Sequence, residues 1–475
     1  MVDAHAHSGR TGLTARGVAL VVAVALFLQM LDGAIIATSL LQMARDFGVA
    51  PLDLSIGVTT YLLVSATFIP VAGWAADRFG STRIFVLAVI VFTLSSVLCG
   101  LAGSLPEFVA ARALQGVGGA FMIPVGRLIA VRNADKSEML DVMALITWPA
   151  LAAPVVGPAL GGAITTYLSW RWNFFINVPL GIGIVAVTLL LVRDPSPRER
   201  RKLDWLGFFL CGGSLSGLLV GLEGFVHFPR QPWFSAGMFC AGLVLGVLAV
   251  LHLRRAGNPL IALAPFKAHT FAVSNLLAGN YARIAINAMP FLLPLFFQTV
   301  YGLDPLQAGG LTMAYFVGNF AMKSVTSPIL RRVGFRSVLV FNGVLAAAFI
   351  ALCAILAPGT AYPLVVAVLV GAGLTRSMQF TSLSSLAFAD IPAEQRSSAV
   401  TITSLTGQVS MIFGVALATL VLSVSQLARG ADALGLGDFQ AAFLVMAGLA
   451  LLSAFLMLRL APDAGDEIAA RAAKA

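Results

Sequence analysis

The chain carries the sequence Gly73-Trp-Ala-Ala-Asp77-Arg78-Phe-Gly80-Ser-Thr-Arg83 between two long apolar stretches. The stretches at 52–74 and 83–103 each provide the roughly 20 mainly apolar residues that a helix needs to cross a bilayer. A short, charged turn between two such stretches predicts a hairpin of membrane-spanning helices.

The same pattern extends over the whole chain. Its 475 residues are 59% hydrophobic and 11% charged, and the mean hydropathy is +0.93. Soluble domains carry about 25% charged residues, so this much apolar surface requires lipid. We predict an all-α polytopic membrane protein with fourteen spanning helices, at about 17–40, 52–74, 83–103, 107–131, 142–166, 172–192, 204–226, 234–254, 271–300, 307–330, 336–357, 361–387, 398–427 and 438–459. The first stretch is too long for a signal-peptide core, so we expect a retained helix.

The positive charges predict the orientation in the membrane. Most of the 30 Lys and Arg residues fall in the N-terminal segment, the even-to-odd connections and the tail, and Arg376 is placed with them near the inner end of its segment. The opposite side holds only Arg45, Arg171, Arg230 and Arg429. By the positive-inside rule, we expect a multi-pass protein of the cell inner membrane with both termini cytoplasmic. The net charge of +9 then reflects topology, with the bilayer as partner and no nucleic acid.

Two basic linkers divide the chain. A second short turn, Leu330-Arg-Arg-Val-Gly334-Phe-Arg336, stands where the first one stands in the other half; any tight basic turn would look similar, so this repeat alone does not decide the division. We expect a cytoplasmic N-terminus at 1–16, a six-helix bundle at 17–192, a linker at 193–203, an inserted helix pair at 204–254, a linker at 255–270, a second six-helix bundle at 271–459 and a cytoplasmic tail at 460–475.

Three further motifs lie within the first six segments. Arginine inside a span is costly and usually functional, although a purely structural hydrogen-bonding role for Arg112 stays open. A proline that kinks a helix, flanked by glycines, allows bending and close packing. Such a helix would serve import as well as export. The motifs are Arg112-Ala-Leu-Gln-Gly-Val-Gly-Gly-Ala120, Ala153-Pro-Val-Val-Gly157-Pro158-Ala-Leu-Gly161-Gly162 and Leu31-Asp32-Gly-Ala-Ile-Ile-Ala-Thr-Ser-Leu-Leu41.

In these motifs the chain resembles the major facilitator superfamily, and within it the 14-helix drug:proton antiporter branch. Ala153 stands where that pattern has glycine, and Ala34, Ala37 and Leu41 replace its usual polar and proline residues. The resemblance implies a major facilitator fold of 6+2+6 helices, alternating access, and proton coupling through Arg112. It also implies that the proline motif marks exporters and that the gating residues are Gly73, Asp77, Arg78, Gly80, Arg83, Gly157, Pro158, Gly161 and Gly162. Gly73 is expected to allow close helix approach, and Asp77 to cap a helix or to pair with arginine.

Among the acids within spans, we single out Asp32 and Glu223. Low dielectric disfavours the anion of a carboxyl group, so both are candidates for carrying the coupled proton. Asp32 is preferred, because its helix should face a central cavity. Glu223 lies in the inserted pair, where lining of the pathway is less clear.

The second half offers cations instead of acids. Arg283 and Lys323 lie within spans, and Asn280 and Asn287 share a helix face with Arg283. We expect a substrate site here that includes Gln298 and Gln379. Pairing of the two cations with Asp32, Glu223 or carbonyl groups is the open alternative.

Other classes fit less well. The ATP-binding loop Gly-x-x-x-x-Gly-Lys-Ser/Thr is absent, and Gly213-Ser-Leu-Ser-Gly217 lies in an apolar helix, not in the strand-to-helix turn that a serine hydrolase needs. A channel or a receptor remains an alternative. We therefore expect a monomeric, non-enzymatic, proton-coupled exporter of drug-like small molecules without cofactor or metal. The second hypothesis is export of an endogenous organic anion or anionic metal chelate through Arg283 and Lys323.

Overall fold

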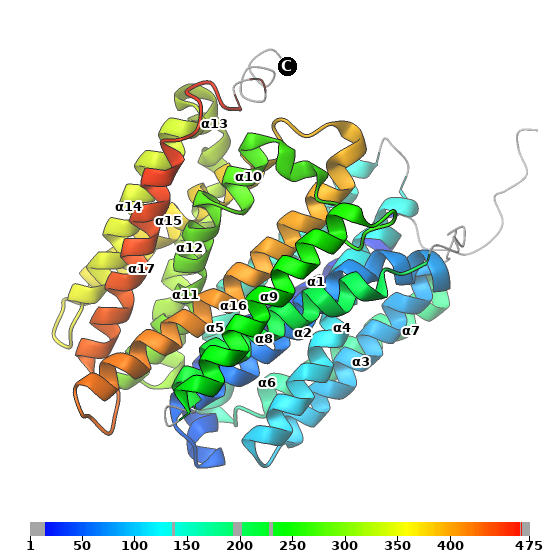
Figure 1. The fold of residues 1–475 in the computed structure, drawn as a ribbon. Helices are drawn as coiled ribbons and strands as arrows, with labels where there is room; N and C mark the ends of the chain where they lie inside the picture. Colours follow the sequence, from blue (N-terminus) through cyan, green and yellow to red (C-terminus); the bar gives the residue numbers. More distant parts are fainter. Residues whose placement is uncertain (1–14, 135–137, 193–201, 228–230, 466, 468–475) are drawn as a thin grey trace, which may run out of the picture.

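A computed structural model describes residues 15–134, 138–192, 202–227, 231–465 and 467. In this described part the chain is helical, with no strand (Figure 1). The expected linker at 193–203, the N-terminal segment 1–16 and the tail 460–475 fall wholly or partly outside it.

The first bundle follows the expected order of six long segments. Its sixth segment begins with a short helix that ends before Asn177. The helices are α1 (Ala15–Phe47), α2 (Ser55–Phe79), α3 (Ser81–Leu101), α4 (Leu105–Arg132), α5 (Met139–Tyr167), α6 (Trp172–Phe175) and α7 (Asn177–Leu191).

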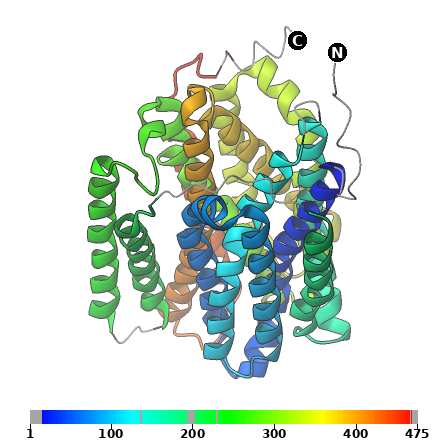
Figure 2. The same ribbon diagram turned by 90° about the vertical axis from the view of Figure 1, so that its right-hand side faces the viewer.

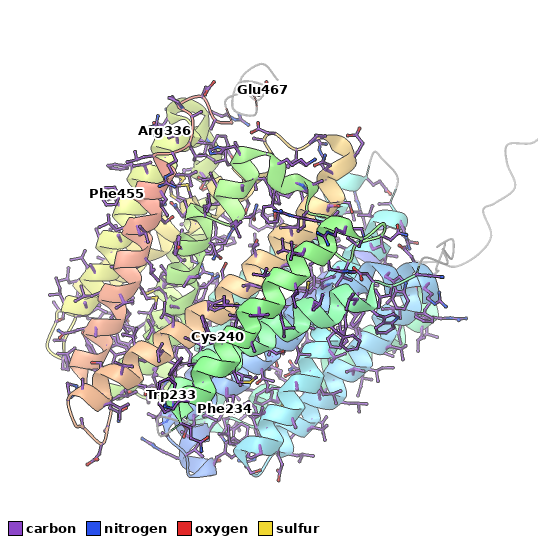
Figure 3. All side chains as sticks on the ribbon, in the orientation of Figure 1. Trp233, Phe234, Cys240, Arg336, Phe455 and Glu467 are labelled. Atoms are coloured by element: carbon purple, nitrogen blue, oxygen red, sulfur yellow. The ribbon has the colours of Figure 1, made fainter. Side chains whose placement is uncertain are left out.

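The inserted pair consists of α8 (Trp205–His227) and α9 (Pro232–Arg255). The helix α8 packs on α2 and α16, and the pair stands at the periphery of the bundle (Figure 2). Large apolar side chains of α9 point outward, among them Trp233, which is 88% exposed, and Phe234 (Figure 3). These faces suit contact with lipid.

The second bundle contains the remaining helices. Twelve helices of the described chain are long and apolar enough to cross a membrane. The expected segments 271–300 and 307–330 are not among the twelve, and each is divided in the structure, so the expectation of two continuous helices is wrong. The helices are α10 (His269–Asn275), α11 (Ala278–Thr299), α12 (Pro305–Ala321), α13 (Lys323–Val333), α14 (Phe335–Ile355), α15 (Tyr362–Ala387), α16 (Arg396–Ala428) and α17 (Leu436–Met457).

The two basic turns have the same backbone geometry. Gly80 separates α2 from α3 with a φ of 96°, and Gly334 separates α13 from α14 with a φ of 83°. Residues with a Cβ are strained at such angles, and glycine is not. The repeat suggested by the sequence therefore extends to backbone conformation, and we call this end of the bundle the glycine-turn end.

The two bundles meet through α5 and α12 and through α2 and α16. Contact between α5 and α12 is closest where glycine removes side-chain bulk: a Cβ on Gly162 would collide with the carbonyl oxygen of Pro305, and one on Gly309 with that of Pro158. Gln298 Nε2 also donates to the carbonyl oxygen of Thr38 at 3.1 Å. These contacts lie toward the end opposite the glycine turns.

Candidate functional site

The acid of α1 and the arginine of α4 form a buried ion pair. Arg112 Nη1 lies 2.8 Å from Asp32 Oδ2, and each side chain is 1% exposed. Removing either charge from water is expensive, and only close pairing with further hydrogen bonds offsets that cost. The two expected proton-coupling residues of the first bundle are thus one unit.

Amide groups complete the surroundings of the carboxylate. Gln115 Nε2 and Asn177 Nδ2 each donate to Asp32 Oδ1 at 2.9 Å, and both also reach the hydroxyl oxygen of Ser96. With Arg112, three donors from α4 and α7 contact the carboxyl group of Asp32.

The guanidinium group of Arg112 has additional partners. Its Nε donates to the carbonyl oxygen of Gly57 at 3.4 Å, and the group lies 4.2 Å from the ring centre of Tyr61, a cation–π geometry. The Tyr61 hydroxyl accepts from Gln29 Nε2 at 3.3 Å. The network therefore links α1, α2 and α4 around one cation.

Sequence reasoning did not assign roles to Gln115, Asn177 or Ser96. Gln115 follows Arg112 by one helical turn and so shares its face. Asn177 begins α7, two residues before Pro179. Both are amide side chains within apolar stretches, and this is the feature of the sequence that could have indicated a role for them. The packing of α3 and α7 beside α1, which brings them to Asp32, is a tertiary effect.

A small pocket of about 40 Å³ lies between the two bundles. Asp32 is not among its lining residues and points instead toward α4 and α7. The neighbours of Asp32 on α1 do line the pocket, together with residues of the second bundle: Gly33, Ala34, Ile36, Ala37, Val58, Pro158, Asn287, Pro290, Phe291, Phe316, Met411 and Val415.

Glu223 lies apart from this network. It is 5% exposed, and its Oε2 accepts from Ser55 Oγ at 3.3 Å. Ser55 begins α2, so the contact joins the peripheral pair to the first bundle. Glu223 does not line the small central pocket.

Arg283 and Asn280 act at the break between α10 and α11. Arg283 Nη1 donates to the carbonyl oxygen of Ser274 at 2.7 Å and reaches Asn275 Oδ1 at 3.3 Å. Asn280 Oδ1 accepts from Ser410 Oγ at 2.8 Å. A cation at the last carbonyls of a helix is stabilising, which is a physical reason for the interruption of the expected helix.

The other expected substrate residues are dispersed. Asn287 lines the small central pocket, whereas Gln298 joins the bundles through Thr38. Gln379 accepts from Asn342 Nδ2 at 2.7 Å within the second bundle. Lys323 lines a separate pocket of about 540 Å³. The structure thus does not gather the six residues into one site.

The expected position of Arg376 near the inner end of its segment is wrong. The helix α15 continues well past it to Ala387, so the residue lies inside the span. Its Nη1 donates to the carbonyl oxygen of Ile286 at 3.2 Å. The carbonyl oxygen of Ile286 and nearby aromatic rings hold the guanidinium group inside the span. The distribution of charges along the sequence does not indicate this position.

The gating residues of the first turn form local contacts. Asp77 Oδ1 lies 2.8 Å from Arg132 Nη2, an arginine pairing of the kind anticipated, and the guanidinium of Arg78 lies 5.8 Å from the ring centre of Trp74. The Arg83 side chain is exposed. The close helix approach expected at Gly73 is wrong, because no heavy atom lies within 4 Å of a Cβ built there.

The proline motif packs on both bundles. A Cβ on Gly157 would lie 2.6 Å from that of Ala34, and one on Gly161 would lie 2.8 Å from Ile35 Cγ2. Pro158 and Gly162 face α12 of the second bundle. The helix α5 therefore contacts the Asp32 helix on one side and the opposite bundle on the other.

Comparisons with known proteins place the fold. The chain is 35% identical over 456 residues to MdtD of Escherichia coli O6:H1 strain CFT073, named as a proposed multidrug resistance protein, covering 94% of this chain and 95% of that one. A D-xylose-proton symporter matches with a TM-score of 0.68 at 15% identity, over 94% of this chain and 98% of that one. The nucleoside transporter NupG matches with a TM-score of 0.64 at 16% identity, over 93% of this chain and 99% of that one.

The Major Facilitator Superfamily sequence profile matches residues 22–415 and 275–474. With an all-helical fold of this kind and a profile match over most of its length, the chain belongs to the Major Facilitator Superfamily of membrane transporters.

Proposed function

We propose that this transporter exports drug-like small molecules in exchange for protons, by alternating access. The observation that carries the proposal is the buried pair of Asp32 and Arg112, with its amide donors, directly behind the wall of the central pocket. The name of the MdtD relative supports drug-like cargo.

Protonation of Asp32 is the proposed switch. A neutral carboxyl group no longer offsets the charge of Arg112, and Gln115 and Asn177 lose a charged acceptor. The favoured arrangement of α1 against α4 then changes. Because α1 packs on Gly157 and Gly161 of α5, the change reaches the surface between the bundles.

The glycine-turn end is the proposed cytoplasmic end, following the charge pattern. The bundles touch most closely toward the opposite end, through Gly162 with Pro305 and Gln298 with Thr38. This arrangement corresponds to a state open toward the cytoplasm, in which cargo loads from inside. A proton taken up from outside then displaces it after the bundles rock.

A second candidate function is export of an organic anion. The pocket that Lys323 lines favours it, since a cation at the wall of a transporter pocket attracts negative charge. Arg283 supports this less, because its contacts are to main-chain and amide oxygens of the helix break.

Transport by the purified protein in sealed vesicles tests the proposal. Ethidium and fluorescein, a planar cation and a planar anion, serve as probes under an imposed pH difference. Saturable, gradient-driven movement of either probe is expected for a proton-coupled carrier. Non-saturating electrodiffusive flux would instead indicate a channel, and no movement of either probe would contradict transport of both classes.

A further inference from the structure

Arg376 lies in the middle of α15 and contacts aromatic rings of α12 and α15. Its guanidinium lies 5.1 Å from the ring centre of Phe380 and 5.7 Å from those of Tyr315 and Phe316. Phe316 also lines the small central pocket. The cation is therefore held against aromatic faces at the edge of that pocket.

Lys323 begins α13, directly after the break at Met322 that follows α12. Phe316 and Phe320 lie four residues apart, on one face of α12. The ring centre of Phe320 lies 5.6 Å from that of Trp148 in α5. Since Trp148 belongs to the first bundle, Phe320 contacts the opposite bundle.

The two cations share one region. Phe380 lines a pocket of about 540 Å³ together with Lys323, and the ring centre of Phe380 lies 5.1 Å from the guanidinium of Arg376. The pocket wall combines the ammonium group with rings and hydroxyl groups, from Lys323, Phe380, Thr381, Ser384, Ser385 and Phe388. Arg376, Phe380 and Ser384 lie on one face of α15, so the guanidinium lies above the same wall.

No acid neutralises this pair in the described part of the second bundle. Asp438 pairs with Arg429, and Asp390 accepts from Thr270 at 2.7 Å. Neither Lys323 nor Arg376 forms an ion pair with a described residue. Two like charges beside the same ring repel each other, and an anionic ligand would relieve their repulsion.

We propose that Lys323 and Arg376 form a binding site for organic anions that carry a carboxylate on a planar aromatic body. Guanidinium groups hold carboxylates through paired hydrogen bonds, the lysine adds a point charge, and Phe380 and Phe388 pack on the ring of the ligand. The proposal rests on the transport function proposed above. It assigns the anion site to Arg376 in place of Arg283, because Arg283 is 2% exposed whereas Arg376 is half-buried.

The test uses the full chain in phosphatidylcholine vesicles, with fluorescein as the anionic probe and ethidium as the cationic one. Arg376→Gln and Lys323→Gln are each expected to lower the initial rate of fluorescein transport about tenfold, the effect of losing about 1.4 kcal/mol of binding, and to lower ethidium transport less than fluorescein transport. Arg376→Lys is expected to recover part of the rate. Arg331→Gln, at an exposed cation of the same helix α13, is the control that should behave as wild type.

The outcomes separate the two proposals. The anion site is overturned if the protein transports ethidium but not fluorescein, or if both Gln variants transport fluorescein at the wild-type rate. The proposed transport function stands in either case. Transport of neither probe overturns the proposed function and this inference together. Added phosphatidylglycerol is expected to leave the fluorescein rate of the wild-type protein unchanged. If the added lipid lowers that rate in the wild-type protein but has no effect on the rate of Arg376→Gln, the site binds a lipid headgroup instead.

Discussion

Asp32 and Arg112 lie 2.8 Å apart on neighbouring helices, and water reaches 1% of each side chain. Such a pair is stabilising only while both charges are present, since either one alone is an uncompensated charge in a low-dielectric interior. In the function proposed above, protonation of the acid has the effect of removing one partner.

A double-mutant cycle tests this interdependence. Arg112→Gln is expected to destabilise the protein by about 3–5 kcal/mol, because Asp32 is left buried and unpaired. Asp32→Asn with Arg112→Gln together should be more stable than Arg112→Gln alone. Thermal unfolding of detergent-purified protein measures the difference, and additive losses in the double variant would show that the two residues act independently.

Close packing at Gly162 is expected to control the state of the transporter. Gly162→Val places side-chain atoms against the main chain of Pro305 and should push the bundles apart at the end opposite the glycine turns. Distance measurements between spin labels on α5 and α12 should show a longer mean distance. Gly183→Val, at a helical glycine with no neighbour within 4 Å of its Cβ, is the matched control, and equal distances in both variants would refute this role.

The paired turns make a prediction for each bundle. Gly80→Ala and Gly334→Ala should each lower stability by about 1–2 kcal/mol, because both residues adopt positive φ. Gly448→Ala, in α17 with open space around the glycine, should be neutral or slightly stabilising. Thermal unfolding checks all three, and unchanged stability at either turn would contradict the assigned backbone geometry.

Asp204 anchors the inserted pair before α8 begins. Its carboxylate accepts from the N–H groups of Gly207 and Leu260 at 2.8 and 3.0 Å and contacts His252 Nε2 at 2.8 Å. Burial alone would raise its pKa, but these hydrogen bonds outweigh burial and lower the pKa below the ordinary 3.8.

Asp204→Ala is therefore expected to cost about 1–2 kcal/mol at neutral pH, through loss of the helix cap. A depressed pKa means that the stabilisation is present above pH 3.8 and is lost as pH falls through the folded-state value. The difference in unfolding temperature from wild type should thus stay constant from about pH 5 to about pH 8. A difference that disappears within this range would show that another group is responsible.

Much of the fold could be predicted from the sequence, because helices that contact lipid are apolar over their whole length and because the motifs between them mark the turns. Apolar length predicted the helices of the first bundle, and the motif around Asp77 predicted the turn at Gly80. The breaks at residues 276–277 and at Met322 escaped prediction, since apolar length does not register a main-chain carbonyl bound by Arg283.

The site was predicted only in part for a similar reason. Asp32 and Arg112 stand out as charges in apolar helices, whereas their pairing depends on how α1 and α4 pack. Arg376 was misplaced because a count of charges by side treats a residue near the middle of a long helix as part of a loop. Aromatic neighbours from α12, such as Tyr315, hold it there, and sequence distance gives no indication of that contact.

Transport by the Asp32→Asn variant in sealed vesicles tests the central claim most directly. Ethidium exchange between the two sides at equal pH requires rocking of the bundles but no net proton movement, while accumulation driven by a pH difference requires both. The account predicts that the variant retains exchange and loses pH-driven accumulation, with Asp141→Asn, at an exposed ion pair with Arg16, behaving as wild type. Full pH-driven accumulation by Asp32→Asn would contradict it.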